Sequence, residues 1–550
     1  MKHNTNKDKK FRGKEMTRRN STKVERELEN VEGATREAED KLVGGRSCLR
    51  HSAENDPSWY AQDPQLLKDA FNLSMADRLG SALTMEVPDP TVSAFPYTTT
   101  TKWFVPGIMN IELVPVPGIS TDGSSAVNVA AKKLFTFIRH ANSGSANYQA
   151  ADLMMYMLAM DNCYTLWNWL VRLYGVARVF STRNAYLPEG LLQTMMVDSR
   201  NISTNLCQLR TLINQFGSKL TTMKVPNHLS YFKRHAWLYS NVFADSDTAK
   251  AQLYLYNPTM LFRWQETVTS GELPYLEPVQ IADPDMSTVW TIDGISSLID
   301  SFINPIFYDE DFNIMSGDIL KAYGEGGCFT VPSIQEDYAV LPVYNPEVGM
   351  QIENAKFADN SKPTDLTSWK ITQSNNEAII FNPILTGTYA DLSNDFLYNF
   401  HSNEVTADMV AVATRLNLIP NQTDVTVVSG TQVKYSLASS GSEIVFGVSM
   451  WSRRIQDNTP TWWRLTVGSH PYFTSIGSAI QYAKGYLSVT QFDWAPILVV
   501  YGANSSTEAP QLLGVVGDLD NYAQISADTL VRMNDVALLS MFGIPGSAGQ

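Results

Sequence analysis

The chain contains one long apolar segment, at residues 151 to 180, whose burial any fold of this sequence must accommodate. The segment reads ADLMMYMLAMDNCYTLWNWLVRLYGVARVF, and its first half is apolar nearly all the way round a helix. The membrane-like run within it, Leu153 to Leu173, is interrupted by Asp161, Asn162, Asn168 and Arg172. Because a charged side chain at bilayer depth is costly, the segment predicts a helix buried in the interior of a soluble protein or at a subunit interface, and not a membrane span.

Methionines are concentrated in this segment, at Met154, Met155, Met157 and Met160. A methionine stripe can line a promiscuous binding groove, or it can fill irregular space in a core. The surrounding positions are also apolar, which favours core packing.

Amphipathic periodicity predicts further helices on both sides of the segment. They are expected from Val127 to the turn at Asn142, from Leu191 to Leu220, around Ala249 to Gln265 with an interruption at Pro258, at Ile295 to Ile303, Asp318 to Tyr323 and Ala407 to Leu418, and from an N-cap at Ser526 to Met541. Past Gly324, alternating Thr, Val, Ile and aromatic residues predict half-buried antiparallel strands. These are Trp369 to Phe381, Val425 to Leu437, Ile444 to Trp451, Trp463 to Val467 and Ile497 to Tyr501. The fold class is therefore α+β, with two or three structural units at this length.

The composition points to contacts between subunits. Apolar residues make up 44% of the chain and charged residues only 18%, and extra apolar surface in a soluble chain usually goes into interfaces. The four cysteines, Cys48, Cys163, Cys207 and Cys328, are far apart and lack CxxC spacing. This spacing indicates free thiols in a reducing compartment, so no structural zinc, other metal or cofactor is expected.

A short basic arm opens the chain. Its first 26 residues carry ten Lys or Arg and three acidic residues, a net charge of +7, whereas the remaining 524 residues carry about −21. The ten basic residues are Lys2, Lys7, Lys9, Lys10, Arg12, Lys14, Arg18, Arg19, Lys23 and Arg26. We expect these ten residues to meet a polyanion, and any nucleic-acid contact to be with phosphates and insensitive to base sequence, because Phe11 is the arm's only aromatic residue on which a base could stack.

Residues 1 to 57 as a whole contain too little apolar surface to offset the entropy of ordering, and we expect them to be disordered when free. A solubilising tail or a nuclear-import signal is the simpler reading of the same basic residues. Charge alone does not decide between these readings.

Signatures of catalysis are missing from the sequence. The seven histidines fall in no metal-binding or nucleophile motif, and no catalytic residue is predicted. His140 follows Arg139 near a predicted helix end, where a cation is stabilised by the terminal carbonyls. Asp309, Glu310 and Asp311 begin like a calcium loop, but Ile314 stands where the loop needs glycine and Leu320 where it needs glutamate. A solvated or helix-capping acidic turn fits that run better.

Several blocks of the sequence resemble the capsid protein of picobirnaviruses. They are Val127 to Ala131, FIRHANSGSANYQAADLMMYMLAMD (137–161), RHAWLYSNVFADSDTAKAQLYLYNPTML (234–261), DEDFNIMSGDILKAYG (309–324), WKITQSNNEAIIFNP (369–383) and QFDWAPILVVYG (491–502). The blocks run in order over about residues 60 to 545, with departures concentrated in residues 385 to 490 and in the arm.

The resemblance implies a picobirnavirus-like capsid fold, with a predominantly helical shell domain and a strand-rich projecting domain. We assign residues 1–57 to a disordered basic arm facing the particle interior, 58–330 to the first part of the shell domain, 331–490 to the projecting domain and 491–550 to a return to the shell domain with a C-terminal helix.

The function implied by the resemblance is self-assembly. Sixty symmetric dimers would form a T=1 icosahedral shell around a double-stranded RNA genome, as part of a virion assembled in the host cytoplasm. The partners are then a second copy of the chain and genomic RNA bound without sequence specificity, and a packaged polymerase is a further candidate. No enzymatic activity and no membrane insertion are expected.

Two other classes of protein stay open at this point. An RNA-binding nonstructural protein would use the acidic body to dock other proteins and would form small oligomers. A hydrolase would need a pocket that gathers His140, His235 or His401 with carboxylates.

Overall fold

The computed structural model describes residues 57–73, 82–86, 100–144, 146–179, 187–266, 273–282, 289–357, 366–374, 377–388, 392, 396–430, 432–456, 459–467, 491–502, 511–516 and 518–544. The chain divides into two compact units, residues 1–76 and 77–550. In the first unit, the 3-10 turn η1 (Pro57–Trp59) precedes helix α2 (Pro64–Phe71). Asp63 caps α2 by accepting a hydrogen bond from the Gln65 amide at 2.9 Å, and no residue of α2 is buried.

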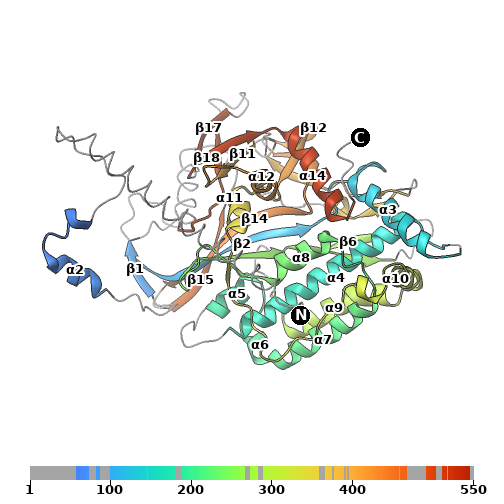
Figure 1. The fold of residues 1–550 in the computed structure, drawn as a ribbon, viewed down its shortest axis with the longest axis horizontal. Helices are drawn as coiled ribbons and strands as arrows, with labels where there is room; N and C mark the ends of the chain where they lie inside the picture. Colours follow the sequence, from blue (N-terminus) through green and yellow to red (C-terminus); the bar gives the residue numbers. More distant parts are fainter. Residues whose placement is uncertain are drawn as a thin grey trace, which may run out of the picture. The chain divides into compact units, whose positions relative to one another are not determined.

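Helix α4 (Ala150–Ala177) lies at the centre of the helical part of the second unit (Figure 1). It contacts α3 (Ala126–Ala141), α7 (Leu206–Thr222), α8 (Ser230–Ser240) and α9 (Ile292–Phe307). The other helices among the described residues of this unit are α5 (Leu187–Thr194), α6 (Ser199–Thr204), α10 (Glu310–Tyr323), α11 (Pro346–Glu353), α12 (Ala407–Ala413) and α14 (Ala527–Met541), with 3-10 turns η2 (Glu325–Gly327) and η3 (Leu366–Trp369). The all-round apolar pattern therefore places α4 where it was expected, in the interior.

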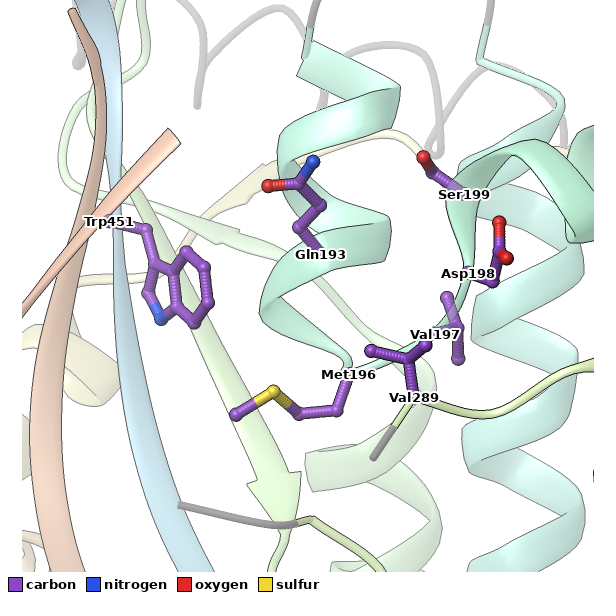
Figure 2. A pocket seen from close by; sticks show the side chains of 7 residues that line it. All are labelled: Gln193, Met196, Val197, Asp198, Ser199, Val289 and Trp451. Atoms are coloured by element: carbon purple, nitrogen blue, oxygen red, sulfur yellow. The ribbon is translucent and has the colours of Figure 1, made fainter. Parts of the chain in front are cut away.

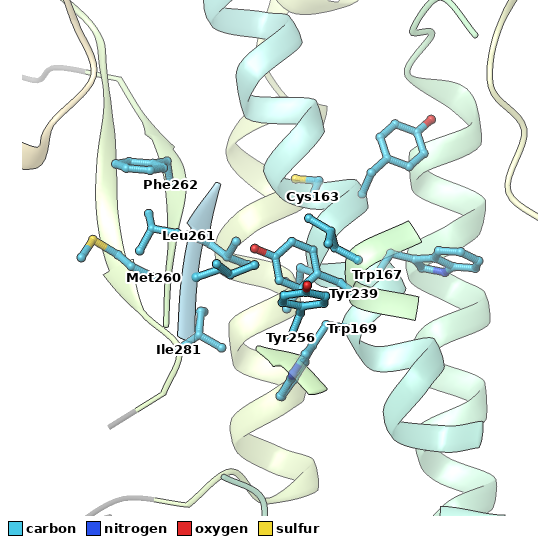
Figure 3. Close-up of a cluster of buried hydrophobic side chains, with 14 of the residues drawn as sticks. Cys163, Trp167, Trp169, Tyr239, Tyr256, Met260, Leu261, Phe262 and Ile281 are labelled. Carbon is cyan, nitrogen blue, oxygen red and sulfur yellow. The ribbon is translucent and has the colours of Figure 1, made fainter. Parts of the chain in front are cut away.

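Every residue of α4 from Leu153 to Val176 is buried, including the four methionines. Figure 3 shows part of this core, in which Trp169 of α4 lies near Tyr239 of α8 and Tyr256 of a neighbouring strand, while Trp167 points toward α7 and its indole donates to the Ile213 carbonyl. The methionine stripe is confirmed as core packing.

A seven-stranded sheet packs beside the helices (Figure 1). Its order is β15 (Thr459–Val467), β14 (Glu443–Gln456), β2 (Thr100–Pro115), β4 (Leu253–Pro258), β3 (Phe243–Ala244) and β7 (Val343–Tyr344), and β1 (Ala82–Glu86) also pairs with β2. The β2–β4 and β3–β7 pairs are parallel, and the other pairs are antiparallel. The sheet thus joins strands that are more than 300 residues apart in the sequence.

Five smaller sheets complete the second unit. One has three strands, in the order β10 (Ile384–Thr388), β13 (Gln432–Ser440) and β12 (Leu418–Ser429). The others are the pairs β5 (Met260–Gln265) with β6 (Tyr275–Gln280), β8 (Thr372–Gln373) with β9 (Ile379–Ile380), β11 (Phe396–Phe400) with β18 (Asn521–Ile525), and β16 (Leu498–Gly502) with β17 (Gln511–Val516).

The helix expected around Ala249 to Gln265 is wrong, because this region forms β4 and β5. All six residues of β4 are buried. A strand buried on both faces reads as a continuous apolar run, and periodicity does not distinguish such a run from a buried helix.

The predicted strands also differ in detail from the observed ones. The expected strand Val425 to Leu437 is the hairpin of β12 and β13, with Gly430 in the left-handed region at φ +56°. Between Trp369 and Phe381 the described residues form the end of η3 and two two-residue strands. No pattern marks the central strand β2, because Pro106 and Gly107 interrupt its alternation.

Local capping signals are confirmed. Ser526 is the N-cap of α14 and accepts a hydrogen bond from the Thr529 amide. Asp309 is the N-cap of α10, and Gly324 ends that helix at φ +72°. The acidic run at Asp309 therefore starts a helix.

Two helical glycines provide a test of how tightly α4 is packed. A Cβ at Gly175 would lie 2.5 Å from Val340 Cγ2 and 2.9 Å from the Val340 amide nitrogen, whereas a Cβ at Gly317 in α10 would meet nothing within 4 Å. We expect Gly175→Ala to lower the free energy of unfolding by about 1–3 kcal/mol through overpacking. The matched control Gly317→Ala should raise it by about 0.5–1 kcal/mol, because alanine is the better helix former.

The measurement is urea denaturation of both variants at one protein concentration. Equal stabilisation by the two substitutions would contradict the packing of residues 338–340 against the end of α4.

Candidate functional sites

The ten basic residues of the arm, from Lys2 to Arg26, lie outside the described residues. Their contact with RNA therefore stays a prediction from charge. Among the described residues we consider three kinds of candidate site. They are a buried charge cluster, a half-buried histidine with two carboxylates, and two surface pockets.

The buried charge cluster consists of Asp161, Arg234, His235 and Glu443. His235 Nδ1 lies 2.7 Å from Asp161 Oδ2, and its Nε2 lies 3.5 Å from Glu443 Oε1. Arg234 donates to both oxygens of Glu443, at 2.7 and 2.8 Å, and the Ser442 hydroxyl also donates to Glu443 Oε1. Two cations therefore face two anions in the interior, which is the condition under which buried charges are tolerated.

Three elements bring this cluster together. Asp161 lies in the middle of α4, Arg234 and His235 lie in the first half of α8, and Glu443 is the first residue of β14. Glu443 is held there because β14 pairs with the end of β2 at Pro115. The cluster thus ties the central helix to the main sheet.

Burial and mutual charge shift the pKa values of this cluster in different directions. Burial lowers the pKa of His235, but the charges and hydrogen bonds of Asp161 and Glu443 outweigh it and raise the pKa to about 9. Burial raises the pKa of Glu443, yet Arg234 and His235 reverse this and hold it well below its ordinary value. For Asp161 burial dominates and its pKa is raised, although His235 offsets part of the effect. His235 is therefore a cation at neutral pH.

Access argues against catalysis at this cluster. The side chains of Asp161, His235 and Glu443 are at most 1% exposed, so a substrate would have to separate α4 from α8 to reach them. The Ser442 hydroxyl is bonded to Glu443 and not to the imidazole. The charge cluster contains the groups of an acid–base site, but its buried ion pairs serve to join α4, α8 and β14.

His401 is the second histidine that the structure brings to carboxylates. Its Nε2 lies 3.1 Å from Glu353 Oε1 and its Nδ1 lies 3.7 Å from Asp520 Oδ2, with the His401 side chain 30% exposed. Asn399 also donates to Glu353, at 2.7 Å. No hydroxyl or thiol is bonded to the His401 ring among the contacts of the described residues, so the cluster lacks the activated nucleophile that a hydrolase of this type needs.

His140, the third histidine of the hydrolase hypothesis, is exposed in the last turn of α3. It lies beside Arg139, which is paired with Asp318 at 3.0 Å. This is the helix-end position that the sequence predicts. Within the part of the chain that the structure describes, no group of three or more His, Cys, Asp or Glu is placed to hold a metal ion.

The two pockets are shallow features of the surface. The first, of about 250 Å³, is lined by Gln193, Met196, Val197, Asp198, Ser199, Val289 and Trp451 (Figure 2). Its only carboxylate, Asp198, is used as the N-cap of α6. The second, of about 410 Å³, lies between α3, α10 and the end of α14, where His228 stacks on Tyr323. Neither pocket gathers an acid–base pair.

None of the described helices has both the length and the apolar character that crossing a membrane requires.

Comparisons with known proteins point in one direction. A family model described as "Picobirnavirus, Capsid protein" matches residues 59–537. The capsid protein precursor of Human picobirnavirus (strain Human/Thailand/Hy005102/-) is 30% identical over 556 residues, which cover 96% of this chain and 97% of that protein. A crystal structure of the picobirnavirus capsid superposes with a TM-score of 0.77 over 90% of this chain and 99% of that one, at 24% identity, which shows a common fold.

The charge cluster predicts a dependence of stability on pH. The pKa of His235 is about 9 in the folded protein against 6.5 in an unfolded chain, so folding is favoured by protonation. The resulting stabilisation, about 3 kcal/mol, is complete below pH 6.5 and is lost as the pH rises through 9. We expect the free energy of unfolding in urea to fall accordingly between pH 6 and pH 9.5.

His235→Gln should be less stable at pH 6 and should lose most of this pH dependence. His140→Gln, which changes an exposed histidine outside the cluster, should keep it. Parallel pH curves for the wild type and His235→Gln would contradict the ion pair.

Proposed function

The chain belongs to the picobirnavirus capsid protein family, and we propose that it assembles as symmetric dimers, sixty to a particle, into a T=1 icosahedral shell around a double-stranded RNA genome. The observation that carries the proposal is the extent of the family match, which runs from residue 59 to residue 537. It covers nearly all of the folded chain and leaves the basic arm outside.

Exposed apolar side chains support assembly. Tyr308, Leu341 and Tyr522 are between 62% and 73% exposed, and Phe71 in α2 is 89% exposed. Single exposed apolar side chains also occur on monomeric proteins, and in the proposed shell neighbouring subunits would cover the ones named here. The residues are spread over several elements, as expected of a subunit with more than one kind of neighbour.

The basic arm, in this proposal, faces the particle interior. One hundred and twenty copies would carry about 840 positive charges into the cavity, while the body at about −21 per copy repels RNA from the shell wall. The ten Lys and Arg would neutralise phosphates without reading bases. The arm then holds the genome loosely and without sequence preference.

The remaining roles follow from the same proposal. The chain acts as a structural and non-catalytic component of the virion, assembles in the host cytoplasm and encloses the viral polymerase with the RNA. Residues 58–330 and 491–550 would form the shell and residues 331–490 the projection, with β14 and β15 of the latter range joined to the main sheet through β2. The strands β10, β12 and β13 supply part of the strand content of that projecting region.

RNA content of particles tests the role of the arm. Replacing its ten Lys and Arg by Gln keeps the length of the arm and removes its positive charge, so we expect shells of normal size that contain much less RNA. The measurement is the ratio of absorbance at 260 and 280 nm of purified particles, with extraction of the RNA.

A matched control replaces the acidic residues that follow the arm, Glu27, Glu29, Glu32, Glu37, Glu39 and Asp40, by Gln or Asn. This control should not reduce the RNA content. Unchanged RNA in the arm variant would contradict the proposed role.

The dimer gives a second test. Obligate interfaces usually bury more than about 2,000 Å², so we expect no folded monomer when particles are dissociated at micromolar concentration. Light scattering coupled to gel filtration should report a dimer as the smallest folded species. A folded monomer that persists under these conditions would rule out an obligate dimer.

A further inference from the structure

The second surface pocket is walled by aromatic rings, and we call it the aromatic pocket. Phe137 of α3, Tyr323 at the end of α10, His228 from the loop before α8 and Phe542 after α14 contribute these rings. Helix α3 contacts both α10 and α14, and the three helices lie at one end of the second unit (Figure 1). The volume of about 410 Å³ falls within the range of sites that take a small ligand, about 300–1,000 Å³.

Contacts between the rings hold the walls of the pocket in place. The ring centroids of Phe137 and Tyr323 lie 4.9 Å apart, and His228 stacks on Tyr323 at 5.2 Å. The backbone closes in on the same histidine at Gly543, which has φ +70° and where a Cβ would lie 3.0 Å from His228 Cδ2. The rings are therefore fixed before a ligand arrives, which lowers the entropy cost of binding.

Two of these rings remain accessible to a ligand. Phe137 is 50% exposed, and His228 is also exposed. Burial of part of the imidazole lowers the pKa of His228 and the charge of Lys233 lowers it further, so the ring is uncharged at neutral pH. An uncharged imidazole beside a phenyl ring offers surfaces on which another flat ring can stack.

A cation stands beside the rings. Lys133 lines the pocket and is exposed one turn before Phe137 on α3, so both side chains lie on one face of that helix. Among the described residues that line the pocket there is no carboxylate. The effect of Lys233 on His228 shows a second positive charge nearby. The pocket therefore attracts anions locally, although the chain as a whole is acidic.

We propose that the aromatic pocket binds an unpaired nucleotide of RNA, with the base against Phe137 and His228 and a phosphate at Lys133. Aromatic side chains combined with a positive groove are the means by which proteins hold single strands without sequence preference. The inference goes beyond the proposed function, in which the arm contacts phosphates alone. Bases inside a duplex are already stacked, so the pocket should distinguish unpaired from double-stranded RNA.

An apolar side chain of another protein segment is the competing occupant. Such a side chain would use the rings but would leave Lys133 without an anionic partner, unless an acidic residue accompanied it. A nucleotide supplies a flat ring and an anion in one group, which matches both features of the pocket. The rings and the charge together thus favour a nucleotide.

Binding of a labelled RNA tests this inference. The protein is the full-length chain with the ten Lys and Arg of the arm replaced by Gln, so that the arm does not bind the probe. The probe is a short single-stranded RNA of mixed sequence that carries a fluorescent dye, compared with the same strand paired to its complement. Fluorescence anisotropy gives the dissociation constant of each over a range of salt concentrations.

We expect Phe137→Ala to weaken binding of the single strand about five- to 150-fold, because a stacking surface is lost, and to leave the salt dependence unchanged. Lys133→Gln should weaken binding and lower the slope of log K against log salt concentration by about 0.7, the value for one phosphate contact. Two matched controls on α3 lie outside the pocket. Val129→Ala, at a side chain that is 39% exposed, and Lys132→Gln, at a lysine whose amine donates to the Gly123 carbonyl at 3.4 Å, should leave both quantities unchanged.

The outcomes separate this inference from the proposed function. Weaker binding by both pocket variants, with the single strand bound more tightly than the duplex, supports the inference. Equal affinity for the duplex, full affinity of a folded Phe137→Ala chain, or no binding by the chain with the neutral arm overturns it, and particles formed by that chain leave the shell proposal intact. Loss of particle assembly in Phe137→Ala without any RNA binding would assign the pocket to a contact between subunits and overturn the inference as well. If Phe137→Ala does not fold, Lys133→Gln changes only an exposed side chain and provides the same test through the salt slope.

Discussion

The burial of α4 is the constraint on which the rest of the fold depends. A helix that is apolar all round has to be enclosed on every side, and α3, α7, α8, α9 and the strands of the sheets do so. Three of its polar side chains find partners in that enclosure, whereas the buried hydroxyls of Tyr164 and Thr165 make no hydrogen bond among the described residues. Asp161 binds His235, the Asn162 side chain accepts from the Phe262 amide at 2.9 Å, and Arg172 donates to Asn257 at 2.7 Å. The same residues that exclude a membrane span thus fix how the surrounding elements dock on the helix.

Features set by neighbouring residues could be predicted from the sequence. The position of α4 and the N-cap Ser526 each depend on a few adjacent side chains, and both were predicted. Strand β4 was not predicted, because a fully buried strand lacks the alternation that identifies a half-buried one. Strand β2 was missed because Pro106 and Gly107 interrupt its alternation, and its partners β4 and β14 lie about 145 and 340 residues further along the chain.

The candidate sites also differ in whether neighbouring residues or pairing between distant segments determines them. The arm is recognisable from charge alone, since binding to phosphates needs cations and little else. The cluster of Asp161, Arg234, His235 and Glu443 could not be foreseen, because Asp161 and Glu443 are brought together only when β14 pairs with β2. The hydrolase hypothesis correctly requires histidines beside carboxylates, and the structure supplies two such sites. At His235 burial removes access, and at His401 the polar partners of the ring seen among the described residues are carboxylates and an amide.

The central claim is that this chain encloses space by assembling with itself. Electron microscopy of the purified full-length chain, expressed alone, tests it most directly. The account predicts uniform hollow particles with icosahedral symmetry, in which twofold axes relate the two chains of each dimer. Small discrete oligomers of the folded protein, without closed particles under any condition of salt and pH that preserves the fold, would contradict it.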